Sequence, residues 1–169
     1  NSNTAIGIGA SGSGSVPAFT ATNAGATAIT GTITVTPTLG TCVGPAITYL
    51  ITVNPQPTST FTQSANQCLT GNTFTFTNTG SSGAGYTYSW NFGGGGATPA
   101  TSTTNNQAGV VYTTPGTYTI THIVTGPGGC TSTTTSTVTI YAMPIVTVND
   151  PTICAGQTAI LTAGGASSY

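Results

Sequence analysis

Alternation of polar and apolar residues is the feature of this sequence that most limits its fold. In GTYTITHIVT, residues 116–125, the even positions from 118 to 124 hold Tyr, Ile, His and Val. A period of two places alternate side chains on opposite faces of a strand. The helix-favouring residues Lys, Arg and Glu are almost absent, since the chain has no Lys or Arg and a single acidic residue. Short runs of this kind, bounded by Gly, Pro, Asn or Ser, predict an all-β protein built as β-sandwiches. We expect strands at residues 18–23, 29–36, 47–53, 58–62, 73–78, 86–92, 116–125, 133–141, 145–148 and 158–163.

The missing charge excludes several classes of function. Without Lys or Arg the chain has no means to bind nucleic acid or an anionic membrane surface by charge. Asp150 is the one acidic residue, so neither a two-carboxylate glycosidase site nor a carboxylate-rich metal site is available. No run of about 18 apolar residues is present. We therefore expect no nucleic-acid partner, no membrane insertion and no cofactor.

The sequence also repeats internally. A Gly-flanked cysteine leads into a strand, a proline-marked joint and a second strand, and a second cysteine and a turn glycine follow. In this pattern Cys42 corresponds to Cys130, and Cys68 corresponds to Cys154. The repetition predicts two junctions between domains, near residues 55–57 and 142–144.

These junctions divide the chain into one complete and two partial domains. Residues 56–141 form the complete unit, residues 1–55 lack a beginning, and residues 142–169 lack an end. The two partial pieces together are almost as long as the complete unit. We expect them to be halves of one sandwich that the next copy in line completes. That copy is either a separate subunit or the following stretch of a long tandem-repeat chain.

Three segments resemble a known family. YTYSWNF (86–92), TTPGTYTITHIVTGPGGCTSTTTSTVTI (113–140) and VPAFTATN (16–23) resemble the PKD-like, Ig-like β-sandwich repeats of large Bacteroidota cell-surface and secreted proteins, including gliding-type adhesins. The resemblance implies sandwiches in series, outside the cell or on its surface. Together with the alternation, it predicts a core that contains Trp90, Tyr118, Ile120, Val124, Phe74 and Phe76. The chain departs from the family in the glycines at 93–96, where an acidic residue is common, and at His122, where the family has an aliphatic residue.

The four cysteines are more consistent with disulfides than with zinc. No CxxC pair is present, and the chain has one His, so clustered zinc ligands are missing. Disulfides are common in exported β-proteins. Cys68 lies near the start of the complete domain and Cys130 near its final strand, so we expect these two to pair. By correspondence of position, Cys154 of one copy is expected to pair with Cys42 of the next.

The candidates for catalysis are few. His122 and Asp150 could belong to a Ser-His-Asp triad, but no GxSxG nucleophile motif is present. His122 is instead expected to face the core and bond to a carbonyl or hydroxyl, and Asp150 to form a turn. The four glycines at 93–96 lack the Lys of a phosphate-binding loop and are expected to form a loop between strands. We predict that the chain is not an enzyme.

The sequence suggests two alternative surface functions, and a single structural role accounts for its other features. The threonine rows in TGTITVTPT and CTSTTTSTVT suit either ice binding or the polar face of a strand. An aromatic side chain left outside the core could bind surface glycans. Our main prediction is a structural repeat of an extracellular filament or adhesin shaft, assembled head to tail with other copies of itself. The alternative is a carbohydrate-binding or spacer module of a secreted enzyme.

Overall fold

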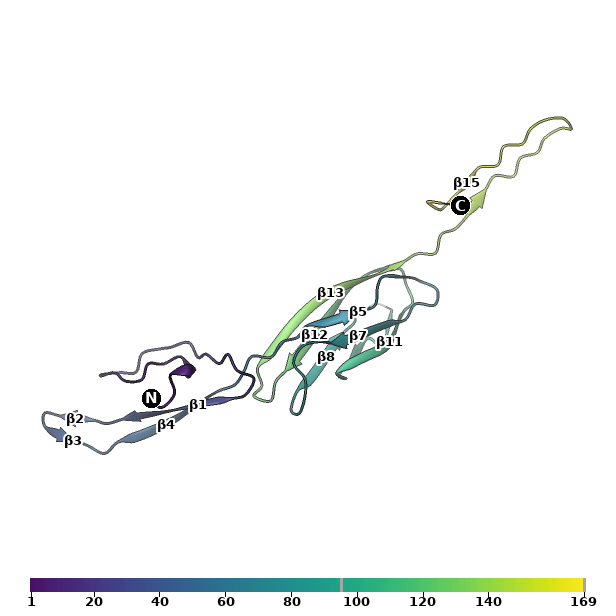
Figure 1. Ribbon diagram of the computed structural model, residues 1–169. Coiled ribbons are helices and arrows are strands. Elements are labelled where there is room, and N and C mark those ends of the chain that lie inside the picture. The colour runs from purple at the N-terminus through teal and green to yellow at the C-terminus, as the bar shows by residue number, and fades with distance from the viewer. Residues whose placement is uncertain (95, 169) are drawn as a thin grey trace.

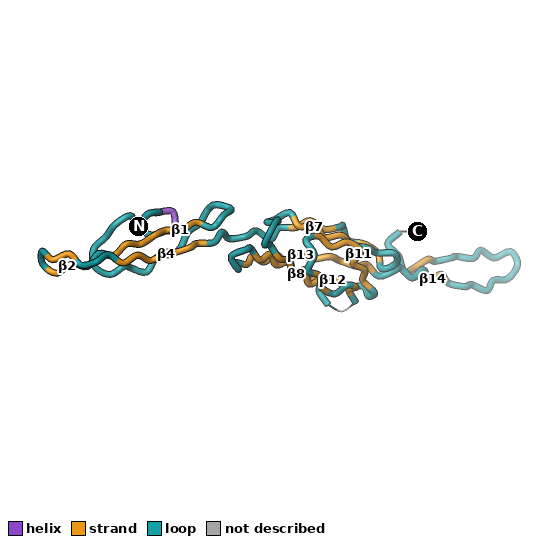
Figure 2. The backbone as a smooth tube through the Cα atoms, turned by 90° about the horizontal axis from the view of Figure 1, so that it is seen from below, coloured by secondary structure: helices purple, strands orange, loops and turns teal. Residues whose placement is uncertain are grey.

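The computed structural model describes residues 1–94 and 96–168 and places three parts in a line (Figure 1). A long hairpin with a coiled N-terminal segment lies at one end, a β-sandwich lies in the middle, and a second hairpin extends from the other end. The view from below shows the same arrangement (Figure 2). No helix in the described part of the chain is long and apolar enough to cross a membrane.

The central sandwich has a five-stranded and a four-stranded sheet. In the larger sheet the order is β10-β8-β12-β13-β6, and in the smaller it is β5-β7-β11-β9. All pairs are antiparallel except β6 with β13, which run parallel. The predicted all-β fold is confirmed: among the described residues the one helical element is a three-residue 3-10 turn, η1 (Thr4–Ile6). The strands of the sandwich are β5 (Phe61–Gln63), β6 (Gln67–Cys68), β7 (Phe74–Asn78), β8 (Thr87–Asn91), β9 (Ala97–Thr98), β10 (Thr101–Ser102), β11 (Asn106–Tyr112), β12 (Gly116–Thr125) and β13 (Thr131–Tyr141).

The core lies between these two sheets. The inward positions of β8 and β12 are the even-numbered ones, as the alternation predicts. Aromatic rings fill much of the space, with Phe76 4.9 Å from Phe92 and Trp90 stacked on Phe92 at 6.0 Å, measured between ring centroids. Each such side chain contributes about 1.5–3 kcal/mol when fully buried. All six residues predicted for the core are at most 9% exposed: Phe74, Phe76, Trp90, Tyr118, Ile120 and Val124.

Side-chain amides cover the free edge of β13. β6 pairs with the end of β13 only, so most of that edge lacks a neighbouring strand. Gln56 Nε2 donates to the Thr131 carbonyl at 2.6 Å, and Gln63 Nε2 donates to the Thr137 carbonyl at 2.7 Å. Backbone acceptors that an incoming strand would use are thus occupied within the chain.

Several strand predictions differ from the structure. Of the predicted strand at residues 158–163 only Ala163 belongs to a strand, the predicted strand at 145–148 shortens to Thr147–Val148, and the two-residue strands β6, β9 and β10 were not predicted. β11 was not predicted, because Gly109, at φ +74°, interrupts the alternation, and the register with β7 shifts between Gln107 and Val110. Residues 18–23 were predicted as a strand but are irregular. Their last residue, Asn23, bonds through its side chain to the carbonyls of Thr27 and Val53.

The flanking parts are open hairpins. β1 (Ile29–Val35) pairs with β4 (Ile47–Val53), and β2 (Thr38–Leu39) pairs with β3 (Cys42–Val43) at the tip. At the other end β14 (Thr147–Val148) pairs with β15 (Ala163–Gly164). Neither hairpin has a second sheet stacked on it, apart from the N-terminal coil that lies along β1 (Figures 1 and 2).

Candidate assembly interface

The two end hairpins expose most of the large apolar side chains that face solvent. Around the N-terminal hairpin these are Val16, Val35, Leu39, Val43, Ile47, Tyr49 and Leu50. In the C-terminal part they are Met143, Ile145, Val146, Val148, Ile153, Ile160 and Leu161. Patches of this kind are common at surfaces that bind another protein, a membrane or a ligand.

The N-terminal hairpin repeats the geometry of β12 and β13. Gly31 of β1 lies opposite Ile51 of β4, just as Gly116 of β12 lies opposite Ile140 of β13. The residues after each glycine also correspond, as GTITV in one strand and GTYTI in the other. The N-terminal hairpin is therefore equivalent to the last two strands of the complete sandwich.

This equivalence assigns an inward face to the N-terminal hairpin. The pair Ile33 and Tyr49 corresponds to the pair Tyr118 and Val138. Val138 is 0% exposed in the sandwich, whereas Tyr49 is 57% exposed. Ile6 covers part of this face over β1, but the position equivalent to a core residue remains open on β4.

The C-terminal hairpin repeats the geometry of β5 and β7. A Cβ at Gly80 would collide with the Thr58 carbonyl oxygen, and a Cβ at Gly165 would collide with the Ile145 carbonyl oxygen. Each glycine thus allows the same close approach of two backbones at the same place in its hairpin. The C-terminal hairpin is equivalent to the first strands of the complete sandwich.

The glycine equivalence fixes which C-terminal side chains should face inward. Counting along the chain from the glycines, Val148 of β14 takes the place of Phe61, and Leu161, two residues before β15, takes the place of Phe76. Phe76 is 0% exposed, whereas Leu161 is 68% exposed. Residues of the C-terminal hairpin that correspond to core positions are therefore exposed in one copy.

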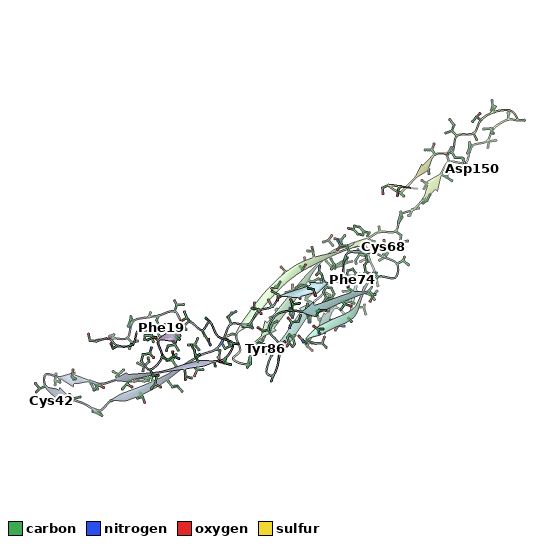
Figure 3. All side chains as sticks on the ribbon, viewed as in Figure 1. Phe19, Cys42, Cys68, Phe74, Tyr86 and Asp150 are labelled. Atoms are coloured by element: carbon green, nitrogen blue, oxygen red, sulfur yellow. The ribbon has the colours of Figure 1, made fainter. Side chains whose placement is uncertain are left out.

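The two hairpins have the form of opposite halves of one sandwich. In the complete domain β5 and β7 belong to one sheet, β12 and β13 belong to the other, and the core separates them. The C-terminal hairpin of one copy and the N-terminal hairpin of another would supply one sheet each. One copy does not bring them together, because they lie at opposite ends of the molecule (Figure 3). Their joining stays a prediction.

His122 is fully buried in the sandwich. Its Nδ1 lies 3.0 Å from the Ser59 carbonyl oxygen, and its ring stacks on Trp90 with centroids 3.7 Å apart. Nε2 has no hydrogen-bond partner among the described residues. Burial lowers the pKa of the imidazole, and the bond to Ser59 offsets part of this shift. Asp150 lies in the exposed C-terminal hairpin, so the structure does not bring these two catalytic candidates together (Figure 3).

Sequence reasoning missed a buried amide that holds the core together. Asn72 Oδ1 accepts from the Tyr112 backbone N–H at 2.8 Å, and Asn72 Nδ2 donates to the Tyr112 and Leu69 carbonyls. The Tyr112 hydroxyl donates to the Phe92 carbonyl at 2.9 Å. Burial, and secondarily the nearby Tyr118, raises the pKa of Tyr112 to about 12. A single Asn beside a turn glycine is too common in sequences to indicate this role.

The predicted disulfide between Cys68 and Cys130 is wrong. Cys68 lies beside Tyr141 at the end of β13, whereas Cys130 directly precedes the start of that strand. The strand is 11 residues long, so its ends are roughly 35 Å apart, and a disulfide needs Cα atoms within about 7 Å. All four cysteines are free. The bond between Cys42 and Cys154 of successive copies is not tested by one copy.

The remaining candidates add no catalytic or ligand-binding geometry. In the described ranges no three His, Cys, Asp or Glu side chains are grouped closely enough to hold a metal ion. Tyr86 and Tyr88 are half-buried, whereas Tyr49 and Tyr141 are exposed at separate places. Of the four glycines at 93–96, Gly95 lies outside the described residues, and the others belong to the loop after β8.

Comparison with known families identifies the family to which the sandwich belongs. A family model described as the PKD domain matches residues 53–140, just over half of the chain. The chain belongs to the PKD domain family. PKD domains are typical of secreted or surface proteins of bacteria. The narrower resemblance to Bacteroidota gliding-adhesin repeats stays a prediction.

Several solved structures are similar to this PKD chain. The PKD1 domain of Vibrio anguillarum Epp is 27% identical, over 54% of this chain and 100% of that one, with a TM-score of 0.43. The PKD1 domain of the Vibrio cholerae metalloprotease PrtV is 28% identical, over 51% and 98%, with a TM-score of 0.41. A structure from work on promiscuous carbohydrate-binding modules of the β-sandwich superfamily is 27% identical, over 54% and 37%, with a TM-score of 0.46. No curated protein matches the chain.

Proposed function

We propose that this chain is a non-enzymatic structural repeat of an extracellular filament or surface adhesin shaft. In this shaft PKD sandwiches follow one another in line. The complete sandwich alternates with a composite sandwich, to which one copy gives its C-terminal hairpin and the next gives its N-terminal hairpin. The observation that carries the proposal is the equivalence of these hairpins to opposite sheets of the complete domain.

The energetics support this assembly. Leu161, Val148 and Tyr49 occupy core positions by equivalence, yet each is more than half exposed in one copy. Burying each of them would stabilise the complex by about 1.5–3 kcal/mol. The chain has no Lys or Arg and one acidic residue, so little charge repulsion opposes the approach of two copies.

The second candidate is a spacer or carbohydrate-binding module of a secreted enzyme. Membership of the PKD family fits this candidate better than it fits the shaft, because this function requires nothing of the flanking hairpins. The exposed Tyr49 and Tyr141 are the aromatic rings that a glycan would contact. The hairpin equivalence is what favours the shaft.

Two neighbouring residues test the proposal. Leu161 is 68% exposed and Ile160 is 75% exposed in one copy, but only Leu161 takes a core position, that of Phe76. Ile160 takes the position of Thr75, which is exposed in the sandwich. Leu161→Asp should abolish assembly, because it would bury a carboxylate in the composite core. Ile160→Asp, with the same change in charge and hydropathy, should leave assembly intact.

Assembly is measured on the purified full chain by light scattering and by electron microscopy of negatively stained material. The proposal expects linear polymers for the unmodified chain and for Ile160→Asp, and single copies for Leu161→Asp. If the unmodified chain remains monomeric at high concentration, or if both variants behave alike, the shared sandwich is wrong. Binding of the monomer to a glycan array would then favour the second candidate.

A further inference from the structure

The cysteines of the complete sandwich lie at opposite poles. Cys68 lies beside Tyr141, where the chain leaves the domain towards the C-terminal hairpin (Figure 3). Cys130 lies in the turn before β13, where the chain enters the domain. Cys68 is exposed and Cys130 is partly exposed. Each cysteine therefore lies at an end of the sandwich and outside its core.

The other two cysteines hold equivalent positions in the hairpins. Cys42 lies at the far tip of the N-terminal hairpin, before β4, as Cys130 lies before β13 (Figure 3). Cys154 follows Val148 by six residues, and Cys68 follows the equivalent Phe61 by seven. Both Cys42 and Cys154 are exposed.

This equivalence places Cys42 and Cys154 at opposite poles of the composite sandwich. Cys154 would lie beside the end of β4, as Cys68 lies beside the end of β13. Cys42 lies at the start of that hairpin arm, roughly 35 Å away along an extended strand. The separation that excludes a bond between Cys68 and Cys130 therefore also argues against the predicted bond between Cys154 and Cys42.

We propose instead that disulfides join facing poles of consecutive sandwiches. Cys68 of one copy bonds to Cys42 of the next, and Cys154 of that first copy bonds to Cys130 of the next. This inference rests on the proposed function, because it needs the composite sandwich to exist. Both bonds connect one copy to its successor, so every junction along the shaft carries one.

A contact within one copy supports the second bond, between Cys154 of one copy and Cys130 of the next. Asn54, which follows β4 directly, donates from Nδ2 to the Gly128 carbonyl at 3.2 Å. Cys130 is two residues beyond Gly128, and the end of β4 is where Cys154 of the preceding copy would lie. The junction between the composite and complete sandwiches thus already contacts the turn that carries Cys130.

The chemistry is a balanced two-electron oxidation. Each bond forms when two thiols lose two protons and two electrons, and the disulfide of an extracytoplasmic thiol–disulfide oxidase accepts them and becomes a dithiol. An extracellular protein meets such oxidants on its route out of the cell.

The test maps the bonds in assembled full-length chain. Free thiols are blocked with iodoacetamide in denaturant without reduction, and the chain is cut with chymotrypsin, because no Lys or Arg is present for trypsin. Chymotrypsin sites separate all four cysteines into different peptides. Mass spectrometry should find the Cys42 peptide joined to that of Cys68, and the Cys130 peptide joined to that of Cys154. Reduction should release all four.

A variant separates the two pairing schemes. In Cys42→Ser the proposal expects complete labelling of Cys68 and continued protection of Cys154, whereas the pairing of Cys42 with Cys154 expects the opposite. Electron microscopy of the same samples shows whether a failure concerns the disulfides alone or the shared sandwich as well. Linear polymers with four labelled thiols, or with Cys154 released by Cys42→Ser, overturn the disulfide proposal alone. Absence of polymers together with free thiols overturns the shared sandwich and the disulfides with it.

Discussion

The stability of the sandwich should depend on pH through one buried ring. His122 is the only His of the chain, it is 0% exposed, and the groups around it are the rings of Phe61, Tyr88 and Trp90 and the Ser59 carbonyl. None of these groups carries a charge that would stabilise an imidazolium. Because burial lowers the pKa of His122, the folded state binds its proton less readily than the unfolded state does.

The sign and size of the effect follow from linkage. The folded-state pKa is depressed, so the full stability is present above the unfolded value of about 6.5, and it is lost as pH falls towards the folded-state pKa. If the ring stays neutral throughout, the loss between about pH 7 and about pH 5 is about 2 kcal/mol, which is the upper bound. For a domain of this size that corresponds to a fall in Tm of roughly 8–16 °C.

The assay is thermal unfolding of the full chain, followed by fluorescence of its single Trp, Trp90, which lies in the sandwich core. The control is His122→Phe, which keeps a ring on Trp90 but cannot take a proton. The two proteins share every other residue, so the difference between their pH dependences reports on the imidazole. Equal pH dependence of Tm in the two proteins would refute the reasoning.

Three further predictions concern packing and surface. Asn72→Ala should destabilise the sandwich by about 2–4 kcal/mol in urea unfolding, because it leaves buried backbone groups of β11 without partners, whereas the exposed Asn105→Ala should cost less than about 1 kcal/mol. Gly80→Ala should lower Tm because its Cβ would collide with the Thr58 carbonyl, whereas Gly12→Ala, with no atom within 4 Å, should leave Tm unchanged within error. Assembly measured by light scattering should persist in about 1 M NaCl, because the chain has no Lys or Arg with which to form ion pairs that salt would screen; dissolution by salt alone would contradict this.

Sequence periodicity predicted those strands in which the alternation is unbroken. The bounds of β4 and β12 match the predicted ranges, because their inward positions repeat without interruption. β11 was missed because Gly109 inserts a bulge that shifts the inward positions by one residue. The range 18–23 alternates equally well but has no sheet partner, and alternation alone does not report whether a partner strand exists.

The candidate interface was only partly predictable. Cysteine and proline spacing indicated the repeat and its phase. The inward residues of the N-terminal hairpin, such as Tyr49, needed the strand register, which comes from contacts between backbones. The cysteine pairing failed because closeness to the start or end of a domain in sequence does not say at which pole a residue lies. Cys68 is near the start, yet the parallel pairing of β6 with β13 carries it to the pole where the chain exits.

If the proposed shaft forms, a chain almost without charge must obtain the specificity of that assembly by other means. Many β-proteins keep their sheet edges apart with charged residues, and this one has no Lys or Arg to place there. On β13 the side-chain amides of Gln56 and Gln63 occupy edge carbonyls instead. With these β13 carbonyls occupied, the exposed apolar faces of the end hairpins are the surfaces through which the proposed assembly would gain most free energy. In the proposed shaft, growth along one axis would then be favoured over lateral pairing by the places where apolar surface remains exposed, without any contribution from charge.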